Sequence, residues 1–409
     1  MNKIIESIKE NKFIWVMAVY FVLFYVVQNF NNRFWMHDFE VYYTASKHFI
    51  SGQQVYNQAF GLVTGVYKYS PFALIIFAPL AILPFFWAKT IYFFLVSGVI
   101  IFLILYIRNF IHRYFFHGIC LTKTHKILFF STLITLVHIY RELHLGNINA
   151  LLLTALILSL NFIISNREYL GGFLIGIVIL FKPHFVALLP LFFLRNRFKA
   201  LLTVLVAIVT GTIIPIIISG VARGIDLHRS WMVTMIGHNT GFDMVESVNT
   251  IPSLLYRFAA RFILPDTNGV FSIAVILIVA GLILLLLINN QRWEKSLDLK
   301  ERKKATVRDF SFEYLVILAV IPSITITDTE HFLLSIPLIM FLLFFLCQIN
   351  RERNVFFYLA IAAFILYGGN WHDLLGHQLS SWVSEAGLLG LGNIIILAMS
   401  LYAFSPYNS

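Results

Sequence analysis

Long apolar runs recur along the whole chain and are separated by short polar breaks. Several runs fall short of the roughly 20 residues that a perpendicular membrane helix needs, but short spans are tolerated where protein or a water-filled cavity covers their backbone. We therefore expect an all-α, polytopic transmembrane helix bundle with about twelve spans. The predicted spans lie near 13–30, 72–84, 88–107, 127–141, 148–165, 170–194, 199–219, 270–290, 313–326, 332–349, 355–368 and 387–404.

Composition supports a membrane protein and excludes a soluble enzyme, a disordered tail and a nucleic-acid-binding module. Apolar residues make up 59% of the 409 positions and charged residues 12%, about half the roughly 25% that is typical of soluble domains. The net charge of +10 is typical of positively charged cytoplasmic loops and of contact with anionic lipid headgroups. Membrane lipids are therefore expected partners, and nucleic acid is not.

Two further features concern the cysteines and the N-terminal segment. Cys120 and Cys347 lie far apart, so neither a disulfide framework nor a cysteine metal motif is expected. The opening MNKIIESIKENK leads into an apolar stretch with no small-residue cleavage site after it. We expect this first span to be a retained anchor rather than a cleaved signal peptide.

Basic clusters predict the orientation of the spans. The largest cluster lies within 292–308, and placing it in the cytoplasm puts the segments 31–71 and 220–269 on the outer face. The expected division is an N-terminal transmembrane module over 1–219 that includes the first outer loop, a second outer loop over 220–269, and C-terminal helices over 270–409. The basic stretch 108–126 disagrees with this count, so either it lies on the membrane interface or the second span is re-entrant.

The first outer loop carries two acids close to the membrane, Asp38 and Glu40. Apolar residues after Glu40 are spaced for one face of a short interfacial helix that Gly52 would end. Asp38 is read either as the cap of this helix or as an acid that faces a cavity. Tyr69, in the segment Tyr-Lys-Tyr-Ser-Pro, is read either as part of an aromatic belt or as the rim of a lipid or sugar site.

Taken together, these segments resemble the GT87 family of integral-membrane glycosyltransferases. The resemblance rests on an acid soon after the first span, a tyrosine pair, a glycine followed by a tyrosine, Tyr-x-Pro and a PLxxLP span. The matching residues are Asp38, Tyr42, Tyr43, Gly52, Tyr56, Tyr69, Pro71 and Pro79–Pro84.

Two later segments extend the resemblance over roughly 31–345. The sequence HLGNINALLLT is similar to the family's Gly-Gln-x-Asn segment, with Asn147 in place of the usual Gln and Asn149 keeping the Asn. A Gly-rich helix and a Lys-Pro break at Lys182 follow, and Thr-Asp-Thr-Glu-His-Phe is similar to an acid-and-His loop near the end. A Trp common in that last loop is absent.

The resemblance implies a GT-C fold and a relation to polyprenyl-phosphate-mannose-dependent α-mannosyltransferases. It implies transfer of mannose, or another hexose or pentose, from a polyprenyl-phosphate donor to a glycolipid or cell-envelope glycan. The reaction would take place on the extracytoplasmic face of the cell membrane, by an inverting single displacement. Asp38 matches the acid that acts as general base, and Glu40 is the alternative.

Several residues are candidates for binding the donor phosphate or sugar. Lys182 interrupts an apolar stretch, which makes it a functional candidate by default, although it could instead snorkel to the interface. His331 and Arg257 match family positions, while Arg141 with Glu142 could simply be a helix-end pair. The full set of candidates is Lys182, His331, Arg257, Arg141, His144, Glu40, Tyr42, Tyr69, Asn149 and Trp231.

No metal and no cofactor is expected. Asp328, Glu330 and His331, or His238 with Asp243, could ligate a cation, but neither spacing is diagnostic. Two other functions stay open. A transporter or flippase of a lipid-linked sugar would show paired broken helices and an internal repeat, neither of which is clear here. A surface-polysaccharide polymerase or ligase would depend on arginines in a late outer loop and would not need Asp38.

Overall fold

The computed structural model describes residues 2–61, 65–118, 124–239, 248–259, 268–325, 328–348 and 355–404. Helices make up 85% of the described residues, and no β-strand occurs among them. The expected all-α, polytopic helical fold is confirmed. Asp243, one of the residues of the metal alternative, lies outside the described residues.

The expected number of about twelve membrane spans is not confirmed. Among the described residues, five helices are long and apolar enough to cross a membrane, and the number rises to seven if each of two bent helix pairs counts as one span. Four shorter apolar helices of 10–17 residues cover other predicted spans, among them Pro71–Ala81 and Leu388–Phe404. The difference arises because several apolar runs form helices too short to cross a bilayer by themselves.

The described chain forms two compact units, each assembled from separate stretches of sequence. One comprises Ala18–Ile100 and Arg141–Gly241, and the other comprises Met1–Met17, Ile101–Tyr140 and Phe242–Ser409. We call the first the acid-loop unit and the second the C-terminal unit. The division into modules and loops expected from the sequence stays a prediction.

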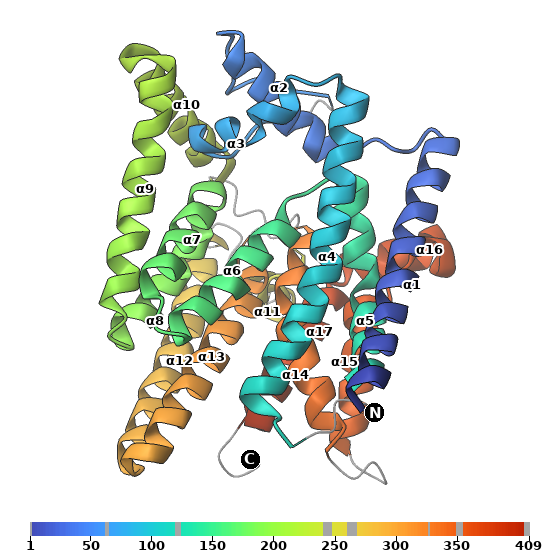
Figure 1. Ribbon diagram of the computed structural model, residues 1–409, viewed down its shortest axis with the longest axis vertical. Coiled ribbons are helices and arrows are strands. Elements are labelled where there is room, and N and C mark those ends of the chain that lie inside the picture. Colours follow the sequence, from blue (N-terminus) through green and yellow to red (C-terminus); the bar gives the residue numbers. More distant parts are fainter. Residues whose placement is uncertain are drawn as a thin grey trace. The chain divides into compact units, whose positions relative to one another are not determined.

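The acid-loop unit contains the first outer loop and the Gly-rich helix. Helix α7 packs along α9, and both helices are labelled in Figure 1. A Cβ on Gly172 of α7 would lie 2.2 Å from the carbonyl oxygen of Ala200, so this packing requires glycine. The helices of this unit are the second part of α1 (Asn2–Phe30), α2 (His37–Ile50), α3 (Pro71–Ala81), the first half of α4 (Phe85–Phe115), α6 (Asn149–Ile164), α7 (Glu168–Phe181), η2 (Pro183–Leu188), α8 (Leu189–Leu194), α9 (Phe198–Ser219) and α10 (Val221–Asn239).

The short helix expected in the first outer loop is α2. It buries an apolar face and ends at Ile50, and Gly52 adopts a left-handed φ of 79° just after its end. The described part of the second predicted outer loop is largely helical, because it contains α10 and α11 (Ile251–Ala259). Part of the basic stretch 108–126 lies outside the described residues.

The C-terminal unit is built around a long helical hairpin and a set of buried apolar helices. Helices α12 (Asn268–Ser296) and α13 (Leu299–Ile324) contact each other and run side by side in Figure 1. Helix α14 (Ile336–Leu346) is buried on almost every side. The other helices of this unit are the first part of α1, the second half of α4, α5 (Thr124–Leu145) as far as Tyr140, α11, η4 (Thr329–Ser335), α15 (Val355–Gly368), α16 (His372–Glu385) and α17 (Leu388–Phe404).

Candidate active site

The first turn of α2 is attached to the end of α5. The backbone N–H of Met36 donates to the carbonyl oxygen of His144 over 3.2 Å. Met36 holds a left-handed φ of 55° and occupies the cap position of α2, while Asp38 is the second residue inside the helix. The alternative that Asp38 is the helix cap is therefore wrong, although a carboxylate in the first turn is still favoured by the helix dipole.

Gly146 allows the turn between α5 and α6 to approach α2. Its φ is +69°, and an added Cβ would lie 2.8 Å from both the Met36 Cε and the Phe39 Cβ. A side chain would be strained by the backbone conformation and would also push α2 away from the turn.

We expect Gly146→Ala to lower the melting temperature of the protein, because the added methyl group displaces α2 locally. A loss of about 1–3 kcal/mol in stability is the usual cost of such overpacking. Thermal melting of the purified protein checks this expectation. Gly118→Ala is the control, because nothing lies within 4 Å of a Cβ at that position. A Gly146→Ala variant that melts at the wild-type temperature would contradict the required close approach.

Asn147 connects this turn to Asp38. Its Nδ2 donates to the Asp38 Oδ2 over 2.7 Å, and its Oδ1 accepts the backbone N–H of Ile148 over 2.7 Å. The second bond fixes which end of the amide faces the carboxylate. The hydroxyl of Tyr92 donates to the carbonyl oxygen of Asn147 over 3.0 Å. Asn147 is 4% exposed and Asp38 is half-buried, so a rigid donor holds an accessible carboxylate.

A second polar network lies beside the first and is deeply buried. The Lys182 Nζ donates to the Asn149 Oδ1 over 2.5 Å, and the Asn149 Nδ2 donates to the Glu142 Oε2 over 3.1 Å. The Glu142 Oε1 accepts the backbone N–H of Ala150, in the first turn of α6, over 2.7 Å. Glu142, Asn149 and Lys182 are 0%, 3% and 7% exposed. An ammonium and a carboxylate are thus joined through one amide, which offsets the cost of burying each charge.

The Lys-Pro break has the form that the sequence predicts. Helix α7 ends at Phe181, Lys182 is extended with φ −132° and ψ 97°, and Pro183 begins η2. Proline has no N–H and disfavours helical backbone angles in the residue before it, so α7 ends here. The Lys182 side chain therefore does not point in the direction that a continued helix would give it. The snorkelling alternative is wrong, since Lys182 is buried and bonded to Asn149.

The tyrosines of the resemblance form one aromatic cluster. The hydroxyls of Tyr42 and Tyr69 lie 2.9 Å apart, and the Tyr56 hydroxyl donates to the carbonyl oxygen of Tyr69 over 2.8 Å. Burial, followed by the nearby Tyr69 and Asp38, raises the pKa of the Tyr42 hydroxyl well above its usual range. Tyr42 therefore stays protonated and keeps its hydrogen-bond donor.

The other candidates of this unit occupy less buried places. Glu40 is half-buried, with its Oε2 3.7 Å from the His37 Nδ1. Arg141 is exposed, and the ring of His144 lies edge-on to Trp35. The Nε1 of Trp231 donates to the carbonyl oxygen of Lys68 over 3.1 Å, which attaches α10 to the first outer loop.

Arg257 and His331 belong to the C-terminal unit. Arg257 is exposed on α11. His331 completes a capping box at the start of η4, where its Nδ1 accepts the backbone N–H of Asp328 over 3.2 Å. Among the described residues, Asp328, Glu330 and His331 bring one ligand atom each to within 4.8 Å of one another. The metal-free expectation stays a prediction.

Two residues of these networks had no functional role in the sequence interpretation. Asn147 drew attention only as a departure from the family's usual Gln, and Glu142 only as a partner for Arg141. The available signal was Glu142 itself, because a carboxylate in apolar surroundings needs a partner, just as Lys182 does.

Comparison with known proteins assigns the chain to a family. The sequence model of glycosyltransferase family 87 matches residues 67–299, which is more than half of the chain. The chain belongs to glycosyltransferase family 87. The match includes Tyr69, the α5–α6 turn and Lys182 of this family 87 protein, whereas Asp38 and His331 lie outside it. The family and the long apolar helices together identify a multi-pass membrane protein.

One curated relative adds to this assignment. An alpha-(1->3)-arabinofuranosyltransferase of Corynebacterium glutamicum is 28% identical over 185 residues. The alignment covers 45% of this chain and 41% of the relative, so it spans less than half of either protein. No solved structure matches the family 87 chain.

Proposed function

We propose that this protein is a glycosyltransferase that moves a sugar from a polyprenyl-phosphate donor to a lipid or glycan acceptor on the extracytoplasmic face. The observation that carries the proposal is the Asp38 carboxylate, which is half-buried and held by the oriented amide of Asn147. Membership of family 87 supports the reaction class. A donor with a lipid tail explains why the enzyme is embedded in the membrane.

In the proposed reaction, Asp38 is the general base. Its carboxylate accepts the proton of the acceptor hydroxyl as that oxygen attacks the anomeric carbon. The bond from the anomeric carbon to the phosphate oxygen breaks on the opposite side, and the lipid phosphate leaves with the electron pair. One displacement of this kind inverts the anomeric configuration. Asn147 occupies one oxygen of Asp38 and so fixes the direction of the carboxylate.

The leaving phosphate needs cationic or hydrogen-bonding groups where its charge develops. Lys182 is the strongest candidate within the acid-loop unit, because it is a lysine on the α7–η2 break in the unit that holds Asp38. Its bond to Asn149 gives it a second role, which is to balance Glu142. The proposed phosphate contacts of His331, Arg257 and Arg141 stay predictions, as does stacking of Trp231 on the sugar.

The donor sugar is either a hexose such as mannose or a pentose. The printed name of the Corynebacterium relative includes an arabinofuranosyl group, and this supports testing a pentose donor. A flippase of a lipid-linked sugar is the second candidate, because two helix pairs are sharply bent at short breaks.

Transfer by the purified protein in lipid nanodiscs tests the proposal. The donors are radiolabelled polyprenyl-phosphate mannose, glucose and arabinofuranose, with the corresponding nucleotide sugars in parallel and membrane lipid extract as acceptor. We expect label to reach a new product from at least one lipid-linked donor and from no nucleotide sugar. Movement of intact labelled lipid between leaflets without a product would favour the flippase, and transfer from nucleotide sugars alone would overturn the donor assignment.

We expect Asn147→Leu to lower kcat by about 10- to 100-fold, the usual value of a hydrogen bond to a charged group. The donor KM should change less than twofold, because the amide of Asn147 is already bonded to Asp38 and to the backbone of Ile148. Asn147→Gln restores the amide and the family's usual residue, so it should recover most of the lost rate. Equal losses in the Leu and Gln variants, or a change confined to KM, would contradict this positioning role.

A further inference from the structure

The C-terminal unit contains a cavity where two apolar helices end. The cavity has a volume of about 850 Å³ and lies between the end of α4 and the turn that joins α12 to α13. The spans Phe85–Phe115 and Val270–Ser296 both end at it. Tyr114, Phe115 and Trp293 supply aromatic lining, which is typical of residues at a membrane–water interface.

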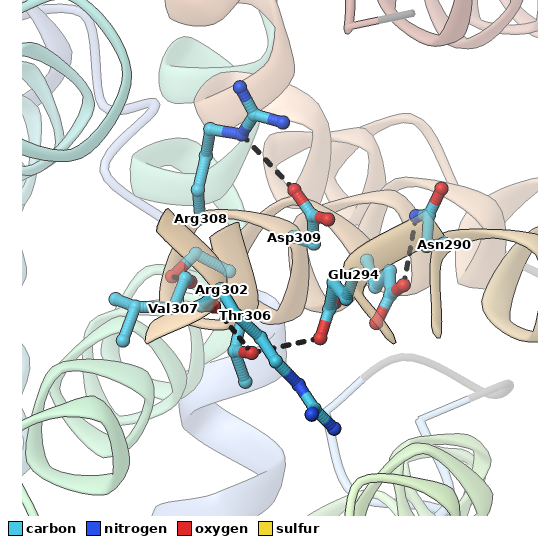
Figure 2. Close-up of polar contacts among 9 residues, drawn as sticks. Asn290, Glu294, Arg302, Thr306, Val307, Arg308 and Asp309 are labelled. Carbon is cyan, nitrogen blue, oxygen red and sulfur yellow. Dashed lines mark hydrogen bonds and ion pairs between the residues drawn. The ribbon is translucent and has the colours of Figure 1, made fainter. Parts of the chain in front are cut away.

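Acidic side chains of the α12–α13 hairpin are buried and accept hydrogen bonds between the two helices. The Thr306 hydroxyl donates to the Glu294 Oε2 over 2.9 Å, and the Asn290 Nδ2 donates to the Glu313 Oε1 over 2.9 Å. Figure 2 shows both contacts between α12 and α13. Glu294 and Glu313 are buried. Three cations remain in the lining, Lys303, Lys304 and Arg308, against one acid, Glu301.

Arg308 is held in place within this lining. Its guanidinium carbon lies 5.4 Å from the ring centroid of Trp293 and 5.1 Å from that of Phe404. Its Nε donates to the Oδ1 of the buried Asp309 over 3.1 Å, as drawn in Figure 2. The Nη2 is buried and has no hydrogen-bond partner among the described residues. A desolvated cationic donor of this kind is costly unless an anionic oxygen reaches it.

We propose that this cavity binds the phosphate headgroup of an anionic phospholipid. The guanidinium of Arg308 and the ammonium groups of Lys303 and Lys304 match the charge and hydrogen bonding of a phosphodiester. A lipid is favoured over a free phosphate because the apolar surface of α12 is available to acyl chains. Only 17% of the apolar stretch of this helix is buried, and its exposed leucines precede the end that lines the cavity. A cluster of basic residues directly after a span is typical of anionic-lipid binding, and the positive-inside rule places it in the cytoplasmic leaflet.

Native mass spectrometry of the full-length protein in detergent tests the proposal, with phosphatidylglycerol and phosphatidylcholine of identical acyl chains as probes. The cavity variant is Lys303→Gln with Lys304→Gln. The matched control is Lys295→Gln with Arg302→Gln, which removes the same charge from exposed positions of the same hairpin outside the lining. We expect phosphatidylglycerol to bind at least about tenfold more tightly than phosphatidylcholine. The cavity variant should lose about tenfold and the control less than twofold.

Four results would overturn the proposal. Equal binding of the two lipids would remove the headgroup preference, and equal losses in the two variants would show diffuse charge attraction only. Displacement of the bound lipid by a millimolar excess of inorganic phosphate would identify a site for free phosphate instead. Bromine-labelled phosphatidylglycerol provides a second measurement, because it should quench a fluorescence component that Trp293→Phe removes. An identical quenched fraction in wild type and Trp293→Phe would place the lipid elsewhere.

Discussion

Asp38→Asn is expected to lower the rate of sugar transfer by about 10²- to 10⁴-fold, the range that a positioned general base contributes. The substitution keeps the size of the side chain and removes its ability to accept a proton. The Asn147 Nδ2 loses a charged acceptor but can still donate to the new amide oxygen, so we expect the fold to persist. Initial rates in nanodiscs, together with the melting temperature of the same sample, check this prediction.

Two controls make the Asp38 result specific. Asp226→Asn is the same chemical change at an exposed position of α10 in the same unit, and it should leave turnover within about twofold, as is usual for surface substitutions. Glu40→Gln tests the alternative base. Full activity of Asp38→Asn beside an inactive Glu40→Gln would transfer the role of base to Glu40.

The second large effect is expected at the buried network of Lys182, Asn149 and Glu142. Lys182→Met leaves the Glu142 carboxylate without its balancing ammonium, and Glu142→Gln leaves the ammonium without its balancing carboxylate. Breaking a buried charge pair by removing one partner costs about 3–5 kcal/mol. Each single variant should therefore melt well below wild type, and the double variant should lose less than the sum of the two single losses.

Lys47→Met is the matched control for this network, because Lys47 is an exposed lysine of α2 in the same unit. Its melting temperature should stay close to that of wild type. Kinetics separate the two roles proposed for Lys182. A variant that melts normally but has a raised donor KM would assign Lys182 to the donor phosphate alone, whereas additive losses in the double variant would contradict the coupling through Asn149.

Local sequence rules were sufficient for the helical fold, for α2 and for the Lys-Pro break. The spacing of apolar residues predicted α2, and Pro183 predicted where α7 ends, because both depend on neighbouring residues. The number of spans could not be obtained in this way. The apolar run of α3 was predicted to be a membrane span, but the helix has only 11 residues. Whether so short a helix crosses a membrane depends on the helices that pack against it.

Three residues of the two polar networks could be singled out from the sequence, but the roles of Asn147 and Glu142 and the connections between the residues could not. Asp38, Asn149 and Lys182 were singled out from charge and from the family pattern. The bond from Asn147 to Asp38 joins residues 109 positions apart, and that from Lys182 to Asn149 joins residues 33 positions apart. No local rule gives such contacts. The contact between Asn147 and Asp38 also needs Gly146, whose missing side chain lets the α5–α6 turn approach α2.

The anomeric configuration of the product tests the central claim most directly. The account assigns one displacement, in which a hydroxyl activated by Asp38 expels a lipid phosphate from the opposite side of the sugar. Nuclear magnetic resonance of the glycan formed from a donor of defined anomeric configuration, isolated before any further processing, reports the outcome. We predict inversion at the anomeric carbon. Retention would require a second displacement or front-side attack and would contradict the role of Asp38 as the base of a single-step transfer.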